Sequence, residues 1–193
     1  CELRHDPDGL LVELISPTGL VETFERDGCG RVTRHRVPGR GATAYGYDPA
    51  GQVVEVTDRH GRREFTRDPA GRIVAATDAL GHTTGYAYDR RGHLVEVTDP
   101  LGGVTRYAHD ECGRVTAVTD PLGRTTRHVR DEAGRVREQH DPTGARRHVT
   151  RDLSGRPSAV TATADDVSVT IRVERDELAR PIRITETGCE TIE

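Results

Sequence analysis

The sequence contains no Trp, no Met and only two Phe, and aromatic residues make up 4% of its 193 positions. Hydrophobic residues reach only 33%, while charged residues reach 31%. A single thick core is hard to build from this composition. The 21 Gly and 10 Pro indicate many turns. We therefore expect many short strands with thin, distributed packing.

Lysine is also absent, so Arg supplies all of the permanent positive charge. The net charge of −4 argues against a nucleic-acid partner, because nucleic-acid binders present a basic face. No apolar run approaches the length that a membrane span requires. We therefore expect neither a nucleic-acid partner nor a transmembrane helix.

A period of about 21 residues organises the whole chain. One turn motif has the consensus Asp-x-x-Gly-Arg and starts at Asp6, Asp27, Asp48, Asp68, Asp89, Asp110, Asp131, Asp152 and Asp176. A second motif, Asp-Pro-x-Gly, follows ten residues after the first. Its clearest copies start at Asp99, Asp120 and Asp141, and variants without Pro start at Asp58 and Asp78.

Both motifs predict tight reversals of the chain. Asp caps a turn with its side chain, Pro presets φ near about −65°, and Gly adopts φ above zero without strain. A type I turn followed by a left-handed Gly is the three-residue hairpin connection with a bulge. The predicted structural turn residues are Asp48, Gly51, Asp68, Gly71, Asp89, Gly92, Asp99, Pro100, Gly102, Asp110, Gly113, Asp120, Pro121, Gly123, Asp131, Gly134, Asp141, Pro142 and Gly144.

The stretches between turns have the length of strands. Six residues separate Gly113 from Asp120 and seven separate Gly102 from Asp110, and both stretches are rich in β-branched residues. We expect about seventeen strands, one after each turn motif. The predicted fold class is all-β: tandem antiparallel β-hairpin repeats of about 21 residues in a continuous twisted meander or spiral.

Two columns of side chains recur at fixed positions in the repeat. An aliphatic residue follows the Gly-Arg step at Val32, Val53, Ile73, Leu94, Val115 and Val136. A predicted packing column lies three residues before the repeat Asp, at Phe24, Tyr45, Phe65, Tyr86 and Tyr107, and continues as His128, Val149 and Val173. We expect the two columns to stack as cross-strand pairs, each worth roughly 0.2–1 kcal/mol. Such pairs would give packing without a central hydrophobic mass.

Residues 153–193 are more degenerate and predict a longer hairpin. The stretch from Val167 to Val173 alternates apolar and polar residues, and the turn before it has lost its Gly. Glu186, Thr187 and Gly188 stand where a second turn is expected, with a further strand after them. We interpret residues 1–193 as a single repeat array that starts and stops inside a repeat, as a fragment of a longer chain would. A lipoprotein anchor at Cys1 is the alternative.

Cys1, Cys29, Cys112 and Cys189 are widely and irregularly spaced, without a CxxC or paired Cys/His pattern. Cys29 and Cys112 hold the same turn position eight strands apart, roughly 38 Å along a continuous ribbon. A disulfide needs Cα atoms closer than about 7 Å. We expect free thiols unless one layer of the ribbon passes over another.

The turn carboxylates and the histidines do not predict a metal, cofactor or catalytic site. Ca²⁺ needs about six to eight converging oxygens, whereas the Asp residues are spread one to a turn. The neighbours in His5-Asp6, His109-Asp110 and His140-Asp141 should point to opposite faces of a strand, so they are not base–orienter pairs. No Ser or Cys lies in a nucleophile motif. We expect no enzymatic activity.

One stretch carries a family resemblance. The segment Tyr86-Ala-Tyr88-Asp89-Arg-Arg-Gly92-His-Leu94 resembles the YD signature Tyr-x-Tyr-Asp-x-x-Gly-Arg-Leu, and Asp-Pro-Leu-Gly follows in its expected place. The chain is similar to RHS/YD-repeat proteins along nearly its whole length. It departs from their pattern where Arg replaces the second Tyr, at Arg26, Arg67, Arg130 and Arg151, and where Ser16 and Val37 replace a turn Asp.

The resemblance implies both a fold and a role. In that family the hairpins wind into a hollow shell, which in bacterial members encloses a C-terminal toxin domain, and teneurins carry a related barrel. This implies a non-catalytic segment of a secreted or cell-surface toxin shell, whose partners are neighbouring repeats and a C-terminal toxin domain of the same chain. The family's self-cleaving aspartyl site would lie beyond Glu193, so no catalytic residue carries over.

Two other functions remain open. The aromatic column could bind glycans, which would make the chain an extracellular carbohydrate-binding or adhesion array. The chain could also be a degenerate array without cargo. Exposed Tyr or Phe would favour the glycan binder.

Overall fold

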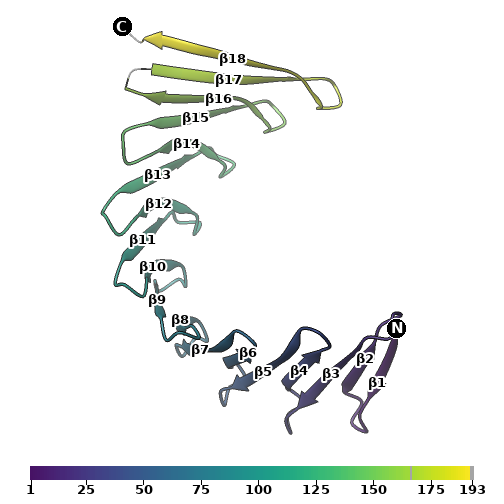
Figure 1. Cartoon of the computed structure of the whole chain (residues 1–193). Coiled ribbons are helices and arrows are strands. Elements are labelled where there is room, and N and C mark those ends of the chain that lie inside the picture. The colour runs from purple at the N-terminus through teal and green to yellow at the C-terminus, as the bar shows by residue number, and fades with distance from the viewer. Residues whose placement is uncertain (166, 192–193) are drawn as a thin grey trace. The chain divides into compact units, whose positions relative to one another are not determined.

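A computed structural model describes residues 1–165 and 167–191 of the chain, with side chains as far as Gly188. All regular structure in this part is β, arranged as eighteen strands that follow one another through turns (Figure 1). The predicted class, all-β with tandem antiparallel hairpins, is confirmed. The predicted count of about seventeen was one too low, because it included only strands that follow a turn and the first strand precedes one.

The chain divides into two compact units, and the first holds Cys1–Ala87 and Val97–Gly102. Each strand of this unit pairs antiparallel with the next from β1 to β9. The strands are β1 (Glu2–His5), β2 (Leu11–Ile15), β3 (Val21–Arg26), β4 (Val32–Val37), β5 (Gly41–Tyr47), β6 (Val53–Asp58), β7 (Gly61–Arg67), β8 (Ile73–Thr77) and β9 (Thr83–Tyr88).

The second unit holds Tyr88–Glu96 and the described chain from Gly103 onward. Its strands pair antiparallel in chain order from β11 to β18. They are β11 (Val104–His109), β12 (Val115–Thr119), β13 (Thr125–Arg130), β14 (Val136–His140), β15 (Arg146–Arg151), β16 (Pro157–Ala164), β17 (Val167–Arg175) and β18 (Pro181–Thr191). The short strand β10 (Leu94–Thr98) has residues in both units.

The hairpin of β16 and β17 is longer than those before it, as the lost turn Gly indicated. Ala164 pairs with Val167, so β16 and β17 extend to eight and nine residues. The expected turn at Glu186–Gly188 was wrong. These residues stay in β18 and pair with Ile171, Thr170 and Val169. The long β17 offers backbone partners along this whole stretch, so β18 continues beside it.

The packing column pairs across strands with a register different from the expected one. Tyr45 lies opposite Val56 and Tyr107 opposite Val118, each three residues beyond the predicted aliphatic partner. Val53 itself lies opposite Tyr47. Antiparallel pairing that starts from Tyr47 and Val53 would already place Glu55 opposite Tyr45, and a bulge at the start of the second strand adds one further residue, so Val56 lies there. The same shift recurs at Phe65, which lies opposite Ala76.

No described residue is fully buried, so neither unit has a hydrophobic core in the usual sense. The column aromatics are half-buried on one face of the sheet, where Phe24 stacks on His35 with ring centroids 4.5 Å apart. The opposite face carries ion pairs, such as Arg62 with Glu55 at 2.9 Å. Each unit is therefore one sheet thick, with chemically different faces.

We predict that the isolated chain self-associates through its terminal strands. Among the described pairings, β1 is joined to β2 and β18 to β17, which leaves each with an outer row of backbone groups that can pair with another chain. Sedimentation velocity should show association that rises with concentration, and a Thr185→Lys substitution on β18 should weaken it. Strictly monomeric behaviour at high concentration would contradict the prediction.

Candidate functional site

The turns that begin with the first motif lie at one edge of each unit, which we call the first-turn edge; the intervening turns form the second-turn edge. At Asp48, Gly51 N donates to Asp48 O at 3.0 Å and Asp48 N donates to Gln52 O at 2.9 Å. Gly51 has a φ of +82°. This is the hairpin connection with a left-handed Gly. The same two backbone bonds occur at Asp68, Asp89, Asp110, Asp120, Asp131, Asp141 and Asp152, and at Asp99 the bond from Gly102 N measures 3.0 Å.

The side chain of the turn Asp stabilises the turn by accepting hydrogen bonds from residues of the same turn. Asp68 Oδ1 accepts hydrogen bonds from Ala70 N at 2.9 Å and from Arg72 N at 3.0 Å, and its Oδ2 accepts one from Arg72 Nε at 2.7 Å. Ser16 Oγ replaces the carboxylate in one turn and accepts from Leu20 N at 3.0 Å. Ion pairs of the Asp68–Arg72 kind recur at Asp27–Arg31, Asp110–Arg114, Asp120–Arg124, Asp131–Arg135 and Asp176–Arg180, and with His at Asp78–His82 and Asp89–His93.

These contacts favour the ionised carboxylate. The hydrogen bond from the Arg72 side chain holds the pKa of Asp68 below its ordinary value, and the backbone hydrogen bond from Arg114 does the same to the pKa of Asp110. The pKa is also lowered at Asp27, Asp78, Asp89, Asp120, Asp131, Asp141 and Asp176. The turns are thus built around charged carboxylates.

Acid should therefore weaken the whole array. A carboxyl whose pKa is lower in the folded than in the unfolded chain stabilises the fold above the unfolded pKa of about 3.9, and that contribution is lost as the pH falls through the folded pKa. We expect the urea midpoint to be nearly constant above about pH 5 and to fall steadily below it. A midpoint that rises on acidification through this range would contradict the account.

The residue just before a first-turn Asp, which we call the staple position, ties its hairpin to the preceding strand in several repeats. Arg67 donates from Nε and Nη2 to Val53 O at 3.2 and 3.1 Å, and from Nη1 to Gly71 O at 2.8 Å. Tyr47 donates from its hydroxyl to Val32 O at 2.6 Å. The acceptor is the carbonyl fifteen residues earlier at Tyr47, Arg26, Arg130 and Arg151, and fourteen residues earlier at Arg67.

The staple arginines are functional residues that sequence reasoning missed. They appear in the sequence only as departures from the Tyr of the repeat signature. The structure shows that Arg does the same work as Tyr and adds a bond to its own turn, as Arg130 Nη1 does to Gly134 O at 3.1 Å. The available signal was that most of the departures are to Arg at the same position. His109 occupies this position too, but its buried Nδ1 has no hydrogen-bond partner.

A second device, which we call the forward contact, links successive first turns within a unit. The side chain that follows a turn Gly extends over the Gly of the following turn. A Cβ on Gly71 would lie 2.6 Å from Gln52 Nε2, and a Cβ on Gly30 would lie 3.1 Å from Leu10 Cδ1. His93 on Gly113, Arg114 on Gly134 and Arg135 on Gly155 are closer still. These turns need Gly for its positive φ, and a Cβ there would also displace the side chain that lies over it.

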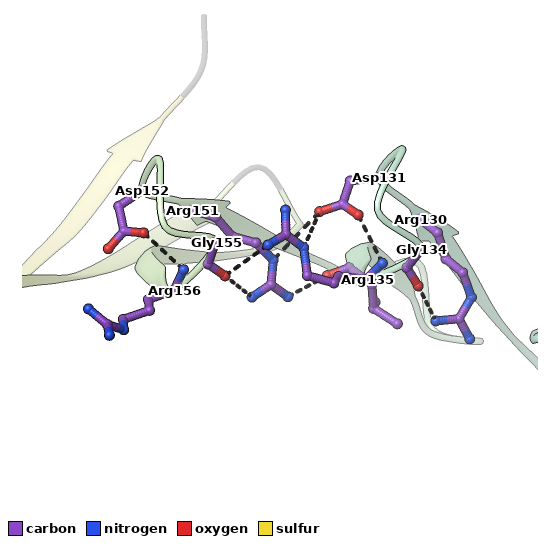
Figure 2. A network of polar contacts seen from close by, with 9 residues as sticks. Arg130, Asp131, Gly134, Arg135, Arg151, Asp152, Gly155 and Arg156 are labelled. Atoms are coloured by element: carbon purple, nitrogen blue, oxygen red, sulfur yellow. Dashed lines mark hydrogen bonds and ion pairs between the residues drawn. The ribbon is translucent and has the colours of Figure 1, made fainter.

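The two devices meet in one network of the second unit (Figure 2). Gly155 O accepts from Arg135 Nη1 at 3.3 Å and from Arg151 Nη1 at 3.4 Å. Asp131 Oδ2 lies 2.9 Å from Arg135 Nε and 3.9 Å from Arg151 Nε. One carboxylate and one carbonyl thereby connect the turns of Asp131 and Asp152.

The second-turn edge differs sharply. Among the described residues, no atom lies within 4 Å of the Cβ position of Gly81, Gly102, Gly123 or Gly144. The leucines at the tips of these turns are open to solvent, with 98% of Leu101 and 81% of Leu80 exposed. The forward contact is thus a feature of the first-turn edge. One close approach occurs at the second-turn edge, where Ala79 lies near Gly61.

The cysteines and histidines, considered as candidate site residues, lie apart from one another. Cys1, Cys29 and Cys112 are exposed with free thiols, and the Cys189 side chain lies outside the described residues. His140 Nε2 lies 3.2 Å from Glu138 Oε2. Within residues 1–165 and 167–191, no three His, Cys, Asp or Glu side chains gather as a metal site would require. In the same part of the chain, no helix has the length and hydropathy needed to traverse a bilayer.

Comparisons with known proteins agree with this geometry. The family model of the RHS Repeat matches residues 47–84, 67–103 and 88–125. No curated protein matches the sequence. The crystal structure of TcdB2-TccC3 superposes with a TM-score of 0.78 at 15% identity, over 96% of this chain and 12% of that chain.

A Tc holotoxin pore of Photorhabdus luminescens that carries a mutation in TccC3 gives a TM-score of 0.78 at 16% identity, over 95% of this chain and 11% of that one. The present chain spans about a tenth of the length of these structures, and at such low identity the likeness shows the fold. The family model thus identifies residues 47–125 as RHS repeats, and the solved structures show the same fold along nearly the whole chain.

Proposed function

We propose that this chain is a wall segment of an RHS-type shell, part of a longer secreted or cell-surface polypeptide whose C-terminal toxin domain the shell encloses. The observation that carries the proposal is the coupling of successive first turns by staples and forward contacts in units that have no buried core. A globular enzyme or receptor is organised around a core. A wall needs only that each hairpin hold the next one.

The mechanism of such a wall is containment. Antiparallel strands joined by continuous backbone hydrogen bonds leave no gap for a protease, and a sheet one layer thick separates two spaces. The two faces suit different surroundings. One carries the half-buried aromatic and aliphatic side chains, and the other carries ion pairs such as Arg106–Glu96 at 3.1 Å. We infer that the aromatic face lines the enclosed space and that the charged face meets solvent.

The glycan-binding alternative receives less support from the side chains. A sugar-stacking platform needs an exposed aromatic face. Phe24 is stacked on His35, and Tyr45, Phe65, Tyr86 and Tyr107 are half-buried within the sheet face. Their surfaces are largely used in contacts between strands, which favours a packing role.

The experiment that tests the proposal is the intact mass and C-terminal sequence of the native polypeptide, recovered with an antibody against this segment. We expect a chain several times larger than 193 residues, with further repeats followed by an unrelated C-terminal domain. Limited proteolysis should leave that domain protected while the shell is intact. A native chain that ends near Glu193 would overturn the proposal, and a long array with no further domain would favour a structure without cargo.

A further inference from the structure

Six turns place a proline directly after the turn Asp. The resulting Asp–Pro bonds are Asp6–Pro7, Asp48–Pro49, Asp68–Pro69, Asp99–Pro100, Asp120–Pro121 and Asp141–Pro142. The prolines are exposed at the tips of the turns, so water reaches these bonds. The bond type matters because an aspartyl side chain can cleave its own peptide bond, and proline makes the better leaving amine.

The reaction is an intramolecular acyl transfer that needs only acid and water. A carboxylate oxygen attacks the main-chain carbonyl carbon of the same Asp and forms a C–O bond, while the C–N bond to Pro breaks. The prolyl nitrogen takes up a proton and leaves as a secondary amine. Water then opens the cyclic anhydride and restores the aspartic acid at a new C-terminus.

The turn geometry activates the carbonyl. In the turn of Asp48 the carbonyl oxygen accepts a hydrogen bond from Gly51 N at 3.0 Å, and in the turn of Asp6 it accepts one from Gly9 N at 3.0 Å. A donor at this position stabilises the negative charge that develops on the oxygen during attack. The same bond is present in the turns of Asp68 and Asp120, both at 2.9 Å. The bond from the Gly amide is therefore common to protected and unprotected turns, and Asp48 O also accepts one from Arg31 Nη1 at 3.4 Å.

The carboxylate is where the turns differ. The residue four positions after the Asp is Arg in two of these turns, and its guanidinium clamps Oδ2: Arg72 Nε on Asp68 at 2.7 Å and Arg124 Nε on Asp120 at 2.6 Å. Attack on the backbone requires this ion pair to break. Gln52 stands at the same position after Asp48 and donates only its backbone N–H, at 2.8 Å to Oδ1.

Leu10 takes this position after Asp6, so its side chain can offer no hydrogen bond at all. Both Asp6 Oδ1 contacts come from backbone amides, those of Asp8 and Leu10, at 3.0 and 2.8 Å. In these two turns, no described side chain clamps the second carboxylate oxygen.

We propose that Asp6–Pro7 and Asp48–Pro49 are sites of acid-induced self-cleavage in the folded protein, and that the guanidinium clamp protects Asp68–Pro69 and Asp120–Pro121. Among these four turns, the residue after the turn Gly thus decides whether a turn can cut itself. Gln52 is the decisive position, because Arg at the equivalent place in other turns binds the carboxylate of the turn Asp.

The test follows the intact mass of the whole chain over days at about pH 4, near the ordinary pKa of an Asp side chain, with circular dichroism to verify the fold. Fragments cut after Asp48 should accumulate about tenfold faster than fragments cut after Asp68, the factor that corresponds to one charge-assisted hydrogen bond. Gln52→Arg should slow the cut after Asp48, and Arg72→Gln should speed the cut after Asp68. In guanidinium chloride the rates at these bonds should become equal.

Equal rates at clamped and unclamped turns in the folded protein would overturn the proposal, as would a Gln52→Arg variant that is cut after Asp48 as fast as the parent. If the fold is lost at this pH, the measurement is repeated at the highest pH that keeps it. Cleavage after Asp48 that occurs only in the unfolded chain would also overturn the proposal, because the folded turn would then be protected without a clamp.

Discussion

Replacing Arg130 with Met is expected to lower the free energy of unfolding by about 3 kcal/mol, the largest effect that we predict for one side chain. The guanidinium donates to Val115 O at 2.7 Å and to Gly134 O at 3.1 Å from a part-buried position. Hydrogen bonds from a charged donor each contribute about 1.5–3 kcal/mol, and the substitution leaves both carbonyls without this partner. Equilibrium unfolding in urea measures the change.

The chain offers both a rescue and a matched control for this substitution. Tyr47 occupies the same staple position and reaches Val32 O, so Arg130→Tyr should recover at least half of the lost stability. Arg127 lies on the same strand, is exposed, and faces the other side of the sheet, so Arg127→Met should cost no more than about 0.5 kcal/mol. Equal losses of stability at Arg130 and Arg127 would contradict the role of the staple position, as would an Arg130→Tyr variant no more stable than Arg130→Met.

Substituting Ala for Gly113 is expected to cost about 2 kcal/mol, twice the cost of the same change at Gly123. The two residues have nearly the same backbone, with φ values of +77° and +80°, so both alanines bear the strain of a left-handed conformation. Only Gly113 lies beneath a neighbouring side chain, the His93 ring, which a Cβ would displace. That ring also stacks on His109 with centroids 5.2 Å apart.

The difference between the two alanine variants isolates the forward contact, because the strain common to both cancels. Urea unfolding of both variants, side by side, gives that difference directly. Should Gly123→Ala prove as costly as Gly113→Ala, the turns would depend on backbone conformation alone and the forward contact would contribute nothing.

Much of the fold follows from short-range chemistry that the sequence displays openly. Asp at the first position of a turn and Gly at the fourth specify the reversal by themselves, and the spacing between Gly113 and Asp120 leaves room for one strand of ordinary length. Even the irregular hairpin after Ala164 could be predicted, because the missing Gly is visible in the sequence. Local structure of this kind needs no knowledge of what lies beside it.

The contacts between repeats could not be predicted in the same way. Whether Arg67 meets the carbonyl of Val53 depends on how two strands approach at an edge, and a consensus treats Arg at that place only as a lost Tyr. The partner of Tyr45 differs from the predicted one because antiparallel pairing from Tyr47 and Val53 already moves it two residues along the strand, and the bulge adds a third. The continuation of β18 through Gly188 depends on the length of its partner β17, which the residues of β18 do not reveal.

The central claim is that each hairpin is held by its neighbours and not by a common core. Chains that end at residue 151 and at residue 130 test it most directly, compared with the full chain by urea unfolding and circular dichroism. The account predicts that both shortened chains keep their β structure and that their free energy of unfolding drops in steps. The slope of that free energy against urea concentration should fall in proportion to chain length. Complete unfolding on removal of residues 152–193 alone would show that the array depends on a single cooperative core, and would contradict the account.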